Sequence, residues 1–459
     1  MSGRSSPNVV FIIADDHRHD ALGSSGHPVV QTPHLDALAA RGTQFTHAYH
    51  MGGLIAAVCS PARASLLTGR NVIAADAAKV ASSSPSCTVS LPADWPTLPQ
   101  LFRQAGYETF ITGKWHNDRA ALHRSFSAGR RIFLGGMSDH TRVPLHDYAD
   151  NGDYSVPPRF EPGFSTELFC DAAVDFLAQR PHDRPFFLYL SLTSPHDPRT
   201  PPGKFAAMYP LGSTPLPDNF SPDHAFDNGE ISIRDEVLAS KPLRPDVLRT
   251  HLAAYYGMIS HHDAQLGRVF DALRTAKLEA DTIVVYVSDH GLALGSHGLL
   301  GKQNLYEHSV RVPLLLAGPG VAPAHRAPGL VYSMDLFATL LQLARLPQPS
   351  RIESQPLPLA PSDTPKPGRD SIFALYKDCQ RMVSDGRWKL IRYRVNGIER
   401  LQLFDLENDP HELSDLAAMP AHQTTLQRLL IRLGDWQNAV GDRWMPPAAG
   451  SSPATSVVQ

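Results

Sequence analysis

The residues best suited to chemistry lie in one short stretch, residues 59–70, which reads Cys-Ser-Pro-Ala-Arg-Ala-Ser-Leu-Leu-Thr-Gly-Arg. Pro61 is typical of the first turn of a helix, because its missing N–H would have no partner there. Gly69 is typical of a helix end, so the stretch predicts a short helix. Cys59 would then lie at the helix N-terminus, where free N–H groups favour negative charge. Arg63 could fold back over Cys59, so we expect a reactive side chain in an anion-binding cup.

The pattern Cys-x-Pro-x-Arg is more informative than the cysteine alone. A lone cysteine is usually a small buried hydrophobic residue, whereas this five-residue pattern should occur by chance on the order of once in tens of thousands of positions. Residues 59–70 resemble the signature of the type I sulfatases, in the alkaline phosphatase superfamily. The resemblance implies that a formylglycine-generating or maturase enzyme oxidises Cys59 to Cα-formylglycine. The hydrated aldehyde would then be the nucleophile.

Polar residues follow four apolar stretches that are typical of buried strands. The four strands are expected at residues 8–14, 109–112, 186–192 and 282–288, with a fifth candidate at 312–317. Helices are expected between them at residues 32–41, 98–105, 166–179 and 248–276, and after the fifth at 335–344. This alternation predicts an α/β fold with a mostly parallel sheet. Ligands bind such sheets at the carboxyl ends of the strands. The polar residues there are Asp15, Asp16, Lys114, His116, His196, Asp289 and His290.

The carboxylates among these residues predict a metal site. Asp15, Asp16 and Asp289 would repel one another strongly unless a cation joined them. The resemblance implies that they bind one divalent metal, usually calcium, together with His290 and position 59 (Cys59). Many family members have Asn where this chain has His290, and an imidazole is an unusual ligand for Ca²⁺. Magnesium and manganese therefore stay open as alternatives.

The resemblance also implies roles for the cationic residues. Lys114 and His116 share a Gly-Lys-Trp-His turn, His196 lies in Ser-Pro-His-Asp-Pro, and Lys302 follows Gly301. By likeness, Arg63 and the metal would activate one hydroxyl of the hydrated aldehyde, which attacks sulfur in line. Lys114 and Lys302 would neutralise the sulfate oxygens. His196, with Lys302, would protonate the leaving alcohol, and His116 would deprotonate the remaining hydroxyl so that sulfate leaves.

Other polar clusters are less specific. The long segment 117–162 contains Asp139, His140 and Arg142, which could bind a sugar or another alcohol. A second cluster after the first strand could border the substrate or form a plain polar loop; it contains His17, Arg18 and His19. A third cluster, in the middle of an expected helix, is better interpreted as structural; it contains His261, His262 and Asp263.

The length of 459 residues allows a large domain and a smaller one. A Pro/Ser-rich stretch at 347–367 marks the boundary, so we expect a catalytic α/β domain over 1–350. Residues 351–445 predict a small antiparallel sheet with a helix, and residues 446–459 a disordered tail. Within the smaller domain, residues 402–412 resemble the C-terminal subdomain of sulfatases. The resemblance implies an alkaline phosphatase-like fold.

Charge and composition exclude several classes of protein. The formal net charge of −3 argues against a general nucleic-acid binder. No stretch approaches the roughly 18 apolar residues of a membrane span, and no signal peptide is recognisable. We therefore expect a cytoplasmic protein, or a periplasmic or secreted one if a leader has been removed. The four cysteines, Cys59, Cys87, Cys170 and Cys379, indicate neither a disulfide framework nor a zinc site. The oligomeric state stays open.

The hypothesis from sequence is a sulfuric ester hydrolase that cleaves a sulfate monoester, of a carbohydrate or another alcohol, to the alcohol and inorganic sulfate. One alternative is a phosphonate monoester or phosphodiester hydrolase of the same superfamily, because the same cations could bind either ester. A second is a catalytically silent protein that binds sulfated glycans.

Overall fold

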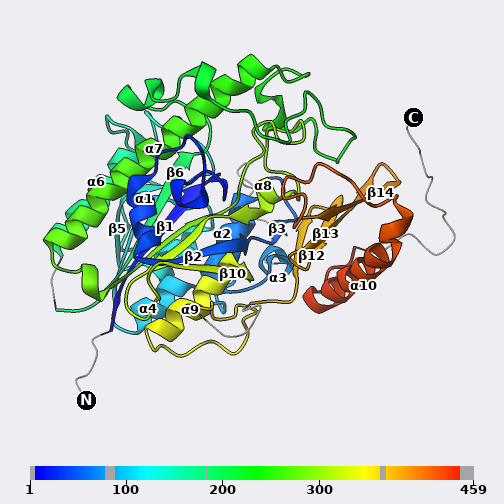
Figure 1. The fold of residues 1–459 in the computed structure, drawn as a ribbon. Helices are drawn as coiled ribbons and strands as arrows, with labels where there is room; N and C mark the ends of the chain where they lie inside the picture. Colours follow the sequence, from blue (N-terminus) through cyan, green and yellow to red (C-terminus); the bar gives the residue numbers. More distant parts are fainter. Residues whose placement is uncertain (1–5, 78–87, 181–182, 362–367, 445–459) are drawn as a thin grey trace.

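The computed structural model describes residues 6–77, 88–180, 183–361 and 368–444. Within them, a nine-stranded sheet has the order β10-β2-β9-β7-β1-β6-β4-β5, and β8 pairs with β2 (Figure 1). Its strands are β1 Asn8–Asp15, β2 Gly42–Tyr49, β4 Glu108–Lys114, β5 Ala128–Phe133, β6 Phe186–Pro195, β7 Thr282–Ser288, β8 Arg311–Val312, β9 Leu314–Ala317 and β10 His325–Tyr332. Most neighbouring pairs are parallel, so the expected α/β class is confirmed.

Helices cover both faces of this sheet (Figure 1). One face carries α1 Pro33–Ala40, α6 Ser165–Gln179 and α7 Pro245–Thr275, and the other carries α2 Cys59–Thr68, α4 Leu98–Gln104 and α9 Leu336–Leu343. Shorter helices are α3 Val72–Ala77, α5 Arg119–Ser125 and α8 Glu307–Val310.

The central strand β1 explains why the sheet is covered twice. Val9, Phe11 and Ile13 belong to the hydrophobic cluster beneath α2, α4 and α9. The alternating residues Val10 and Ile12 belong to the cluster beneath α1, α6 and α7. Side chains of a strand point alternately to the two faces, so a continuous apolar run has to be buried on both. This burial fixes where β1 ends, and therefore where its terminal aspartate lies.

Several expected elements differ from the structure. The strand expected over 312–317 is two strands, β8 and β9, separated at Pro313, and β9 runs antiparallel to both β2 and β7. Proline cannot donate a backbone hydrogen bond to the sheet, which accounts for the break. The polar strand β2 was not expected, and neither was β10, which lies at the sheet edge. Segment 117–162, expected to be irregular, contains α5 and β5.

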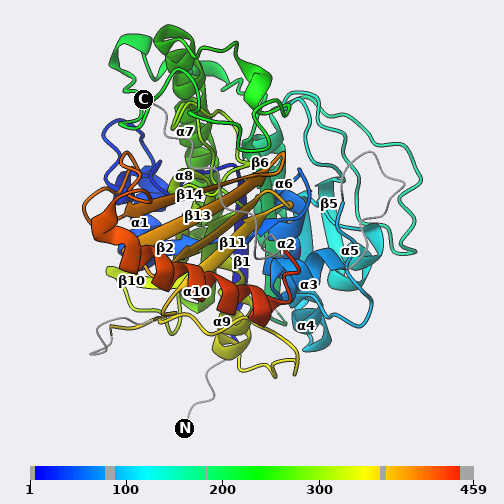
Figure 2. The ribbon, with the colours of Figure 1, turned by 90° about the vertical axis from the view of Figure 1, so that its right-hand side faces the viewer.

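A second, smaller sheet packs beside the first. Its strands are β11 Ile372–Tyr376, β12 Gln380–Ser384, β13 Trp388–Val395 and β14 Ile398–Asp405, and α10 Gln423–Val440 lies across it (Figure 2). These four strands pair antiparallel, as expected. The sheet also contains the two-residue strand β3, Gly52–Gly53, which pairs parallel with β11. A segment just before α2 therefore completes the C-terminal sheet.

Two features discussed from the sequence lie outside the described residues. The tail at 446–459 and Cys87 lie in the segments that the structure does not describe. Cys59, Cys170 and Cys379 are free thiols. No helix within the described ranges is long and apolar enough to cross a membrane.

A buried ion-pair network joins the two sheets. Lys389 of β13 is fully buried, and its Nζ lies 2.9 Å from Glu307 Oε1 and 2.8 Å from Glu412 Oε1. Tyr49 of β2 donates its hydroxyl to Glu307 Oε2 at 2.9 Å. Glu307 begins α8, a few residues after Lys302, so the network anchors the segment that carries a candidate site residue.

Replacing Lys389 by alanine should destabilise the fold strongly. Lys389→Ala leaves two carboxylates buried without their cation, which costs about 3–5 kcal/mol. Arg244→Ala is the matched control, because Arg244 pairs with Asp246 at 2.8 Å while the two side chains are 72% and 64% exposed; an exposed pair contributes about 0–1 kcal/mol. Thermal unfolding of the purified variants checks this. Equal melting temperatures for the two variants would show that the buried pair does not hold the sheets together.

Candidate active site

The carboxyl ends of four parallel strands bring the expected polar residues to one edge of the sheet. Asp15 is the last residue of β1 and Lys114 the last of β4, and Lys114 Nζ lies 2.6 Å from Asp15 Oδ2. His196 follows β6, and its Nε2 lies 3.9 Å from Asp16 Oδ2. Asp289 follows β7 and accepts a hydrogen bond from Asp16 N at 3.3 Å. These residues share one buried site, as the sequence predicts.

Cys59 faces this site from the first residue of α2, which begins slightly earlier than Pro61 alone suggests. Its thiol is 3% exposed. The Sγ atom lies 3.2 Å from His290 Nε2 and 3.7 Å from Lys302 Nζ. In a formylglycine, oxygens on the same Cβ would take the place of Sγ. The thiol therefore marks where a nucleophilic oxygen would sit, next to two cationic side chains.

Arg63 contacts the sheet edge and lies near enough to Cys59 to interact with it electrostatically. Its Nε donates to Asp289 Oδ2 at 2.9 Å, and one terminal nitrogen donates to Ser191 Oγ of β6 at 2.6 Å. The other terminal nitrogen lies 3.9 Å from Asp15 Oδ2. Arg63 thus links the helix that carries Cys59 to the carboxylates at the sheet edge.

The donor set fits a divalent cation. Ligand atoms of Asp15, Cys59, Asp289 and His290 lie within 4.8 Å of one another, and a second such group joins Asp15 and Asp16 to His196. Asp15 Oδ1 is buried and has no hydrogen-bond partner among the described residues. A buried carboxylate oxygen needs a partner to offset its loss of hydration, and a metal ion supplies one. Three carboxylates suit hard cations such as Ca²⁺, Mg²⁺ or Mn²⁺.

His290 stands at the centre of this charge cluster. Its Nδ1 lies 3.1 Å from Asp16 Oδ1, and its Nε2 lies 3.5 Å from Asp289 Oδ1. Burial alone would lower the pKa of His290, but the Asp289 carboxylate outweighs it and raises the pKa to about 9. Metal binding requires the neutral imidazole and would release this proton. The ring thus offers one nitrogen to a cation or carries a proton in its place.

The lysines hold fixed positive charges around Cys59. Lys302 Nζ lies 2.9 Å from Asp16 Oδ1. Burial would lower the pKa of Lys302, but Asp16 overrides this effect and raises it, so the ammonium persists at neutral pH. Burial would raise the pKa of Asp15, but the Lys114 charge lowers it, so that carboxylate stays ionised. The cluster pairs anions with cations and leaves donors for an oxyanion near position 59.

His196 is oriented by its neighbours. Its Nδ1 lies 2.8 Å from the Asp197 carbonyl, and its own carbonyl lies 3.0 Å from His140 Nε2. Burial and the Lys302 charge lower the pKa of His196 well below its usual value. The imidazole is therefore neutral until an anion arrives, since a nearby negative charge favours the protonated form.

The three residues expected to contact substrate separate in the structure. His140 is 1% exposed, and its Nδ1 lies 2.8 Å from Ser165 Oγ, so both ring nitrogens are held inside the protein. The expectation that it reads the substrate is corrected: it supports the His196 backbone. Arg142 is exposed and lies over the Phe160 ring. Asp139 is exposed and lines a cavity beside Asp197.

His116 is tied to α2 from the turn after β4. Its carbonyl accepts a hydrogen bond from Ser60 Oγ at 2.8 Å, one residue after Cys59. Its ring packs against Gly136, where an added Cβ would lie 2.9 Å from the imidazole. The absence of a side chain at Gly136 therefore makes room for the ring.

The remaining polar clusters form structure around the site. His17 Nε2 lies 2.8 Å from Ala21 O, Arg18 pairs with Asp20 at 2.7 Å, and His19 is partly buried beside them. This favours the polar-loop alternative for residues 17–19. In α7, His262 Nε2 lies 3.0 Å from Tyr286 OH. Asp263 accepts from Leu35 N at 2.8 Å at the start of α1. Both agree with the structural interpretation.

Sequence reasoning missed a set of residues that supports Lys302. Gln303 Oε1 accepts from Lys302 N at 3.0 Å, and Gln303 Nε2 donates to Asp235 Oδ2 at 2.8 Å. Asp235 also pairs with Arg234 at 2.8 Å, and Arg234 pairs with Asp197. Asp235 lies between β6 and α7, far from Lys302 in the sequence. Gln303 could have been noticed as a neighbour of Lys302, but nothing in the sequence connects either residue to Asp235.

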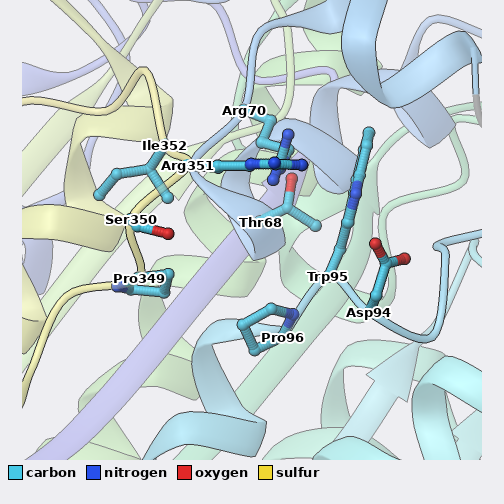
Figure 3. Close-up of a pocket in the computed structure, with 9 residues that line it drawn as sticks. All are labelled: Thr68, Arg70, Asp94, Trp95, Pro96, Pro349, Ser350, Arg351 and Ile352. Atoms are coloured by element: carbon cyan, nitrogen blue, oxygen red, sulfur yellow. The ribbon is translucent and has the colours of Figure 1, made fainter.

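A cavity of about 170 Å³ lies at the opposite end of α2 and does not belong to this site (Figure 3). It is lined by Thr68, the last residue of the helix, and by Arg70, Trp95 and Arg351. The Arg70 guanidinium lies 4.1 Å from the Trp95 ring centre. With ten residues at about 1.5 Å each, the helix separates this cavity from Cys59.

Comparison with known proteins identifies the family. The Sulfatase family model matches residues 7–346. The chain belongs to the sulfatase family. A second model, N-sulphoglucosamine sulphohydrolase, C-terminal, matches residues 295–439. This sulfatase is a sulfate ester hydrolase, as the sequence predicts, and the expected resemblance is confirmed.

Curated relatives match over most of their length. An ulvan-active sulfatase of Formosa agariphila is 27% identical over 96% of this chain and 83% of its own. An arylsulfatase of Clostridium perfringens is 29% identical over 93% of this chain and 94% of its own. An iduronate 2-sulfatase of Mus musculus is 30% identical over 76% of this chain and 71% of its own.

Solved structures share the fold. A structure in complex with its substrate D-glucosamine-2-N,6-O-disulfate superposes with a TM-score of 0.79 at 22% identity, and covers 96% of this chain and 99% of its own. A phosphonate monoester hydrolase of Agrobacterium radiobacter superposes with a TM-score of 0.75 at 22% identity, covering 95% and 96%. At these identities the likeness is one of fold.

Divalent metal should stabilise the metal-stripped enzyme. An ion that binds the folded state alone raises the unfolding free energy by mass action, about 2.7 kcal/mol at one hundred times its dissociation constant. We expect Ca²⁺, Mg²⁺ or Mn²⁺ to raise the melting temperature of the wild type. Asp289→Asn should abolish this shift, whereas Asp139→Asn, an exposed carboxylate outside the cluster, should keep it. A wild-type shift in Asp289→Asn would place the metal elsewhere.

Proposed function

We propose that this sulfatase acts with residue 59 as Cα-formylglycine and with one divalent metal, Ca²⁺ by preference, at Asp15, Asp16, Asp289 and His290. The observation that carries the proposal is the position of Cys59 Sγ, which lies within hydrogen-bonding reach of His290 and Lys302 at the edge of three buried carboxylates. A thiol that served only in packing would be expected among apolar side chains, because burying charged groups is costly.

The modified residue and the metal would supply an oxygen nucleophile at position 59 and positive charge beside it. The chain's own residues do the rest. The charges of His290 and then Arg63 lower the pKa of Asp289 against the effect of burial, and the 2.9 Å contact of Arg63 also holds the sheet edge against α2. Lys114 and Lys302 present their ammonium groups to an ester whose sulfur faces Cβ of residue 59. Their charges would stabilise the oxygens that gain negative charge as the ester bond breaks.

Proton transfer falls to His196, Lys302 and His116. Lys302 carries a proton at neutral pH because Asp16 raises its pKa. Nδ1 of His196 lies against the Asp197 carbonyl and so carries a hydrogen, which leaves Nε2 without one in the neutral ring. The charge of a bound ester would favour protonation of the ring at Nε2, and His196 would donate that proton. We assign the leaving alcohol to these two groups. We assign deprotonation of the residue-59 hydroxyl to His116, which the Ser60 hydroxyl ties to the start of α2.

We propose a carbohydrate sulfate as the substrate. Two of the relatives are named for sulfated sugars, ulvan and iduronate, and one solved structure holds a sulfated glucosamine. We also propose that a formylglycine-generating or maturase enzyme is a partner during synthesis. The cytoplasmic location stays a prediction, which fractionation of the native host would test.

Residue 59 should be both essential and chemically altered. Cys59→Ala should lower kcat/KM for 4-nitrophenyl sulfate by about 10⁴-fold or more, because the nucleophile is lost. Cys170→Ala is the control, a buried thiol in α6 outside the site. In protein from the native host, mass spectrometry should find the residue-59 peptide lighter, by one sulfur and two hydrogens lost and one oxygen gained. An unmodified thiol in fully active enzyme would contradict the proposal.

Sulfate esters should be preferred over phosphorus esters. We expect kcat/KM for 4-nitrophenyl sulfate to exceed that for phenylphosphonate monoesters and bis-nitrophenyl phosphate. All of these esters carry one negative charge, but a sulfate monoester presents three terminal oxygens to Lys114, Lys302 and the metal, whereas a phosphonate monoester or phosphodiester presents two and carries an organic group in the third position. Preference for phosphorus esters by orders of magnitude would assign the chain to phosphonate or phosphodiester hydrolysis. Tight binding of sulfated glycans without turnover by formylglycine-containing protein would instead favour the silent alternative.

A further inference from the structure

A second cavity, of about 580 Å³, adjoins the sulfatase site. Its walls come from the loop after β5, the segment after His196 and the first turns of α7. The polar residues that line it are Asp139, Asp197, Arg199, Arg234 and His251, and apolar residues such as Pro198, Leu238 and Ala254 complete the wall.

The cavity shares its wall with the catalytic cluster. Asp197 directly follows His196, and its carbonyl lies 2.8 Å from His196 Nδ1. Arg234 pairs with Asp197 and with Asp235, and Asp235 holds the Gln303 side chain beside Lys302. The cavity therefore lies next to the position that the alcohol part of an ester would occupy if its sulfate lay against His196 and Lys302.

The charged side chains that line the cavity differ in whether the protein supplies them with a partner. Arg234 is neutralised by Asp197 and Asp235. Asp139 accepts two hydrogen bonds from Thr141, each at 2.8 Å. In contrast, Arg199 forms no ion pair or hydrogen bond with any described residue, and its Nε is shielded from solvent without a partner. Arg199 as a whole is only partly buried and lines the cavity, so its unpartnered terminal nitrogens are open to an anion there, while the shielded Nε has lost hydration that no described residue replaces.

The acidic side chains nearest to Arg199 do not serve as its ion-pair partners. Asp16 and Asp235 act on Arg199 electrostatically, yet neither comes within ion-pair distance of it. Asp16 already contacts Lys302 at 2.9 Å, and Asp235 contacts Arg234 at 2.8 Å. Burial and the Arg199 charge lower the pKa of His251, so this neighbouring imidazole is neutral and can share a hydrogen bond with an anion.

We propose that Arg199 binds a second anionic group, a carboxylate or a sulfate, on the alcohol part of the substrate. The enzyme would then select sulfated sugars that carry another negative charge. A guanidinium suits this role because its planar N–H groups match both oxyanions in a bidentate geometry. This inference rests on the proposed function and goes beyond it, since it names the residue that distinguishes charged from uncharged sugar sulfates.

The test compares matched substrates that differ in one charge. Glucuronic acid 2-sulfate is paired with glucose 2-sulfate, and glucosamine 2-N,6-O-disulfate with N-acetylglucosamine 6-sulfate. We expect kcat/KM to favour the charged member of at least one pair by about 10- to 100-fold. The pair that shows the preference identifies the anion as carboxylate or sulfate.

Variants then assign the preference to one residue. Arg199→Gln should bring the ratio within the preferred pair close to one, mainly through a higher KM for the charged member. Arg199→Lys should retain part of the ratio, because charge remains without the bidentate fork. Arg249→Gln is the matched control, since Arg249 lies on the same helix as His251 but donates to Thr214 O at 3.3 Å; its ratio should equal that of the wild type.

An inhibition measurement on the wild-type enzyme tests the proposal even if the Arg199 variants do not fold. Glucuronate or glucosamine N-sulfate should inhibit 4-nitrophenyl sulfate hydrolysis at least 10-fold more strongly than glucose. Equal kcat/KM within both pairs, with 4-nitrophenyl sulfate still hydrolysed, would overturn the role of Arg199 and leave the sulfatase intact. A preference that persists in Arg199→Gln would also overturn it. Failure to hydrolyse any sulfate ester would instead overturn the proposed function itself.

Discussion

Three aspartates that are buried side by side constrain the whole catalytic end of this protein. Asp15, Asp16 and Asp289 cannot stay ionised together without positive partners. Each has a different cation, brought from a different part of the chain: Lys114, Lys302 and Arg63 respectively. The fold has to deliver those cations to within about 3 Å, and most of its architecture can be understood as the means of doing so.

The parallel sheet positions the three aspartates and Lys114. β1, β4 and β7 are held in register by uninterrupted apolar packing on both faces, so their polar ends meet at one edge. The remaining components come from outside the sheet. α2 carries Cys59 and Arg63, and the segment before α8 carries Lys302. That segment is anchored to the second sheet because Glu307, which begins α8, pairs with Lys389 of β13. Through this contact the C-terminal region helps to position Lys302, although no described residue of that region is assigned to the site.

The strongest elements could be predicted because their signals are local. β1, β6 and β7 are continuous apolar runs, and the residue that ends each run is polar, so both the strand and the site residue could be read together. β2 and β10 were missed because polar residues interrupt their apolar pattern, and their pairing depends on strands far away in sequence. Arg234 and Asp235 were missed for the same reason: they gain their role only through contacts with Asp197 and Gln303. His140 was misplaced because burial in a long loop leaves no periodicity in the sequence.

The pairing of β3 with β11 has a consequence for the order of events during synthesis. Gly52 lies so close to Leu375 that a Cβ on it would be 1.8 Å from the Leu375 carbonyl, and the loop from β3 leads directly into the helix of Cys59. β11 leaves the ribosome more than 300 residues after β3, which at ~5–20 residues per second takes tens of seconds. Until then β3 and the loop that leads from it to α2 lack this pairing. The segment that carries Cys59 therefore reaches its final surroundings, in which Cys59 is 3% exposed, only after most of the chain has been synthesised.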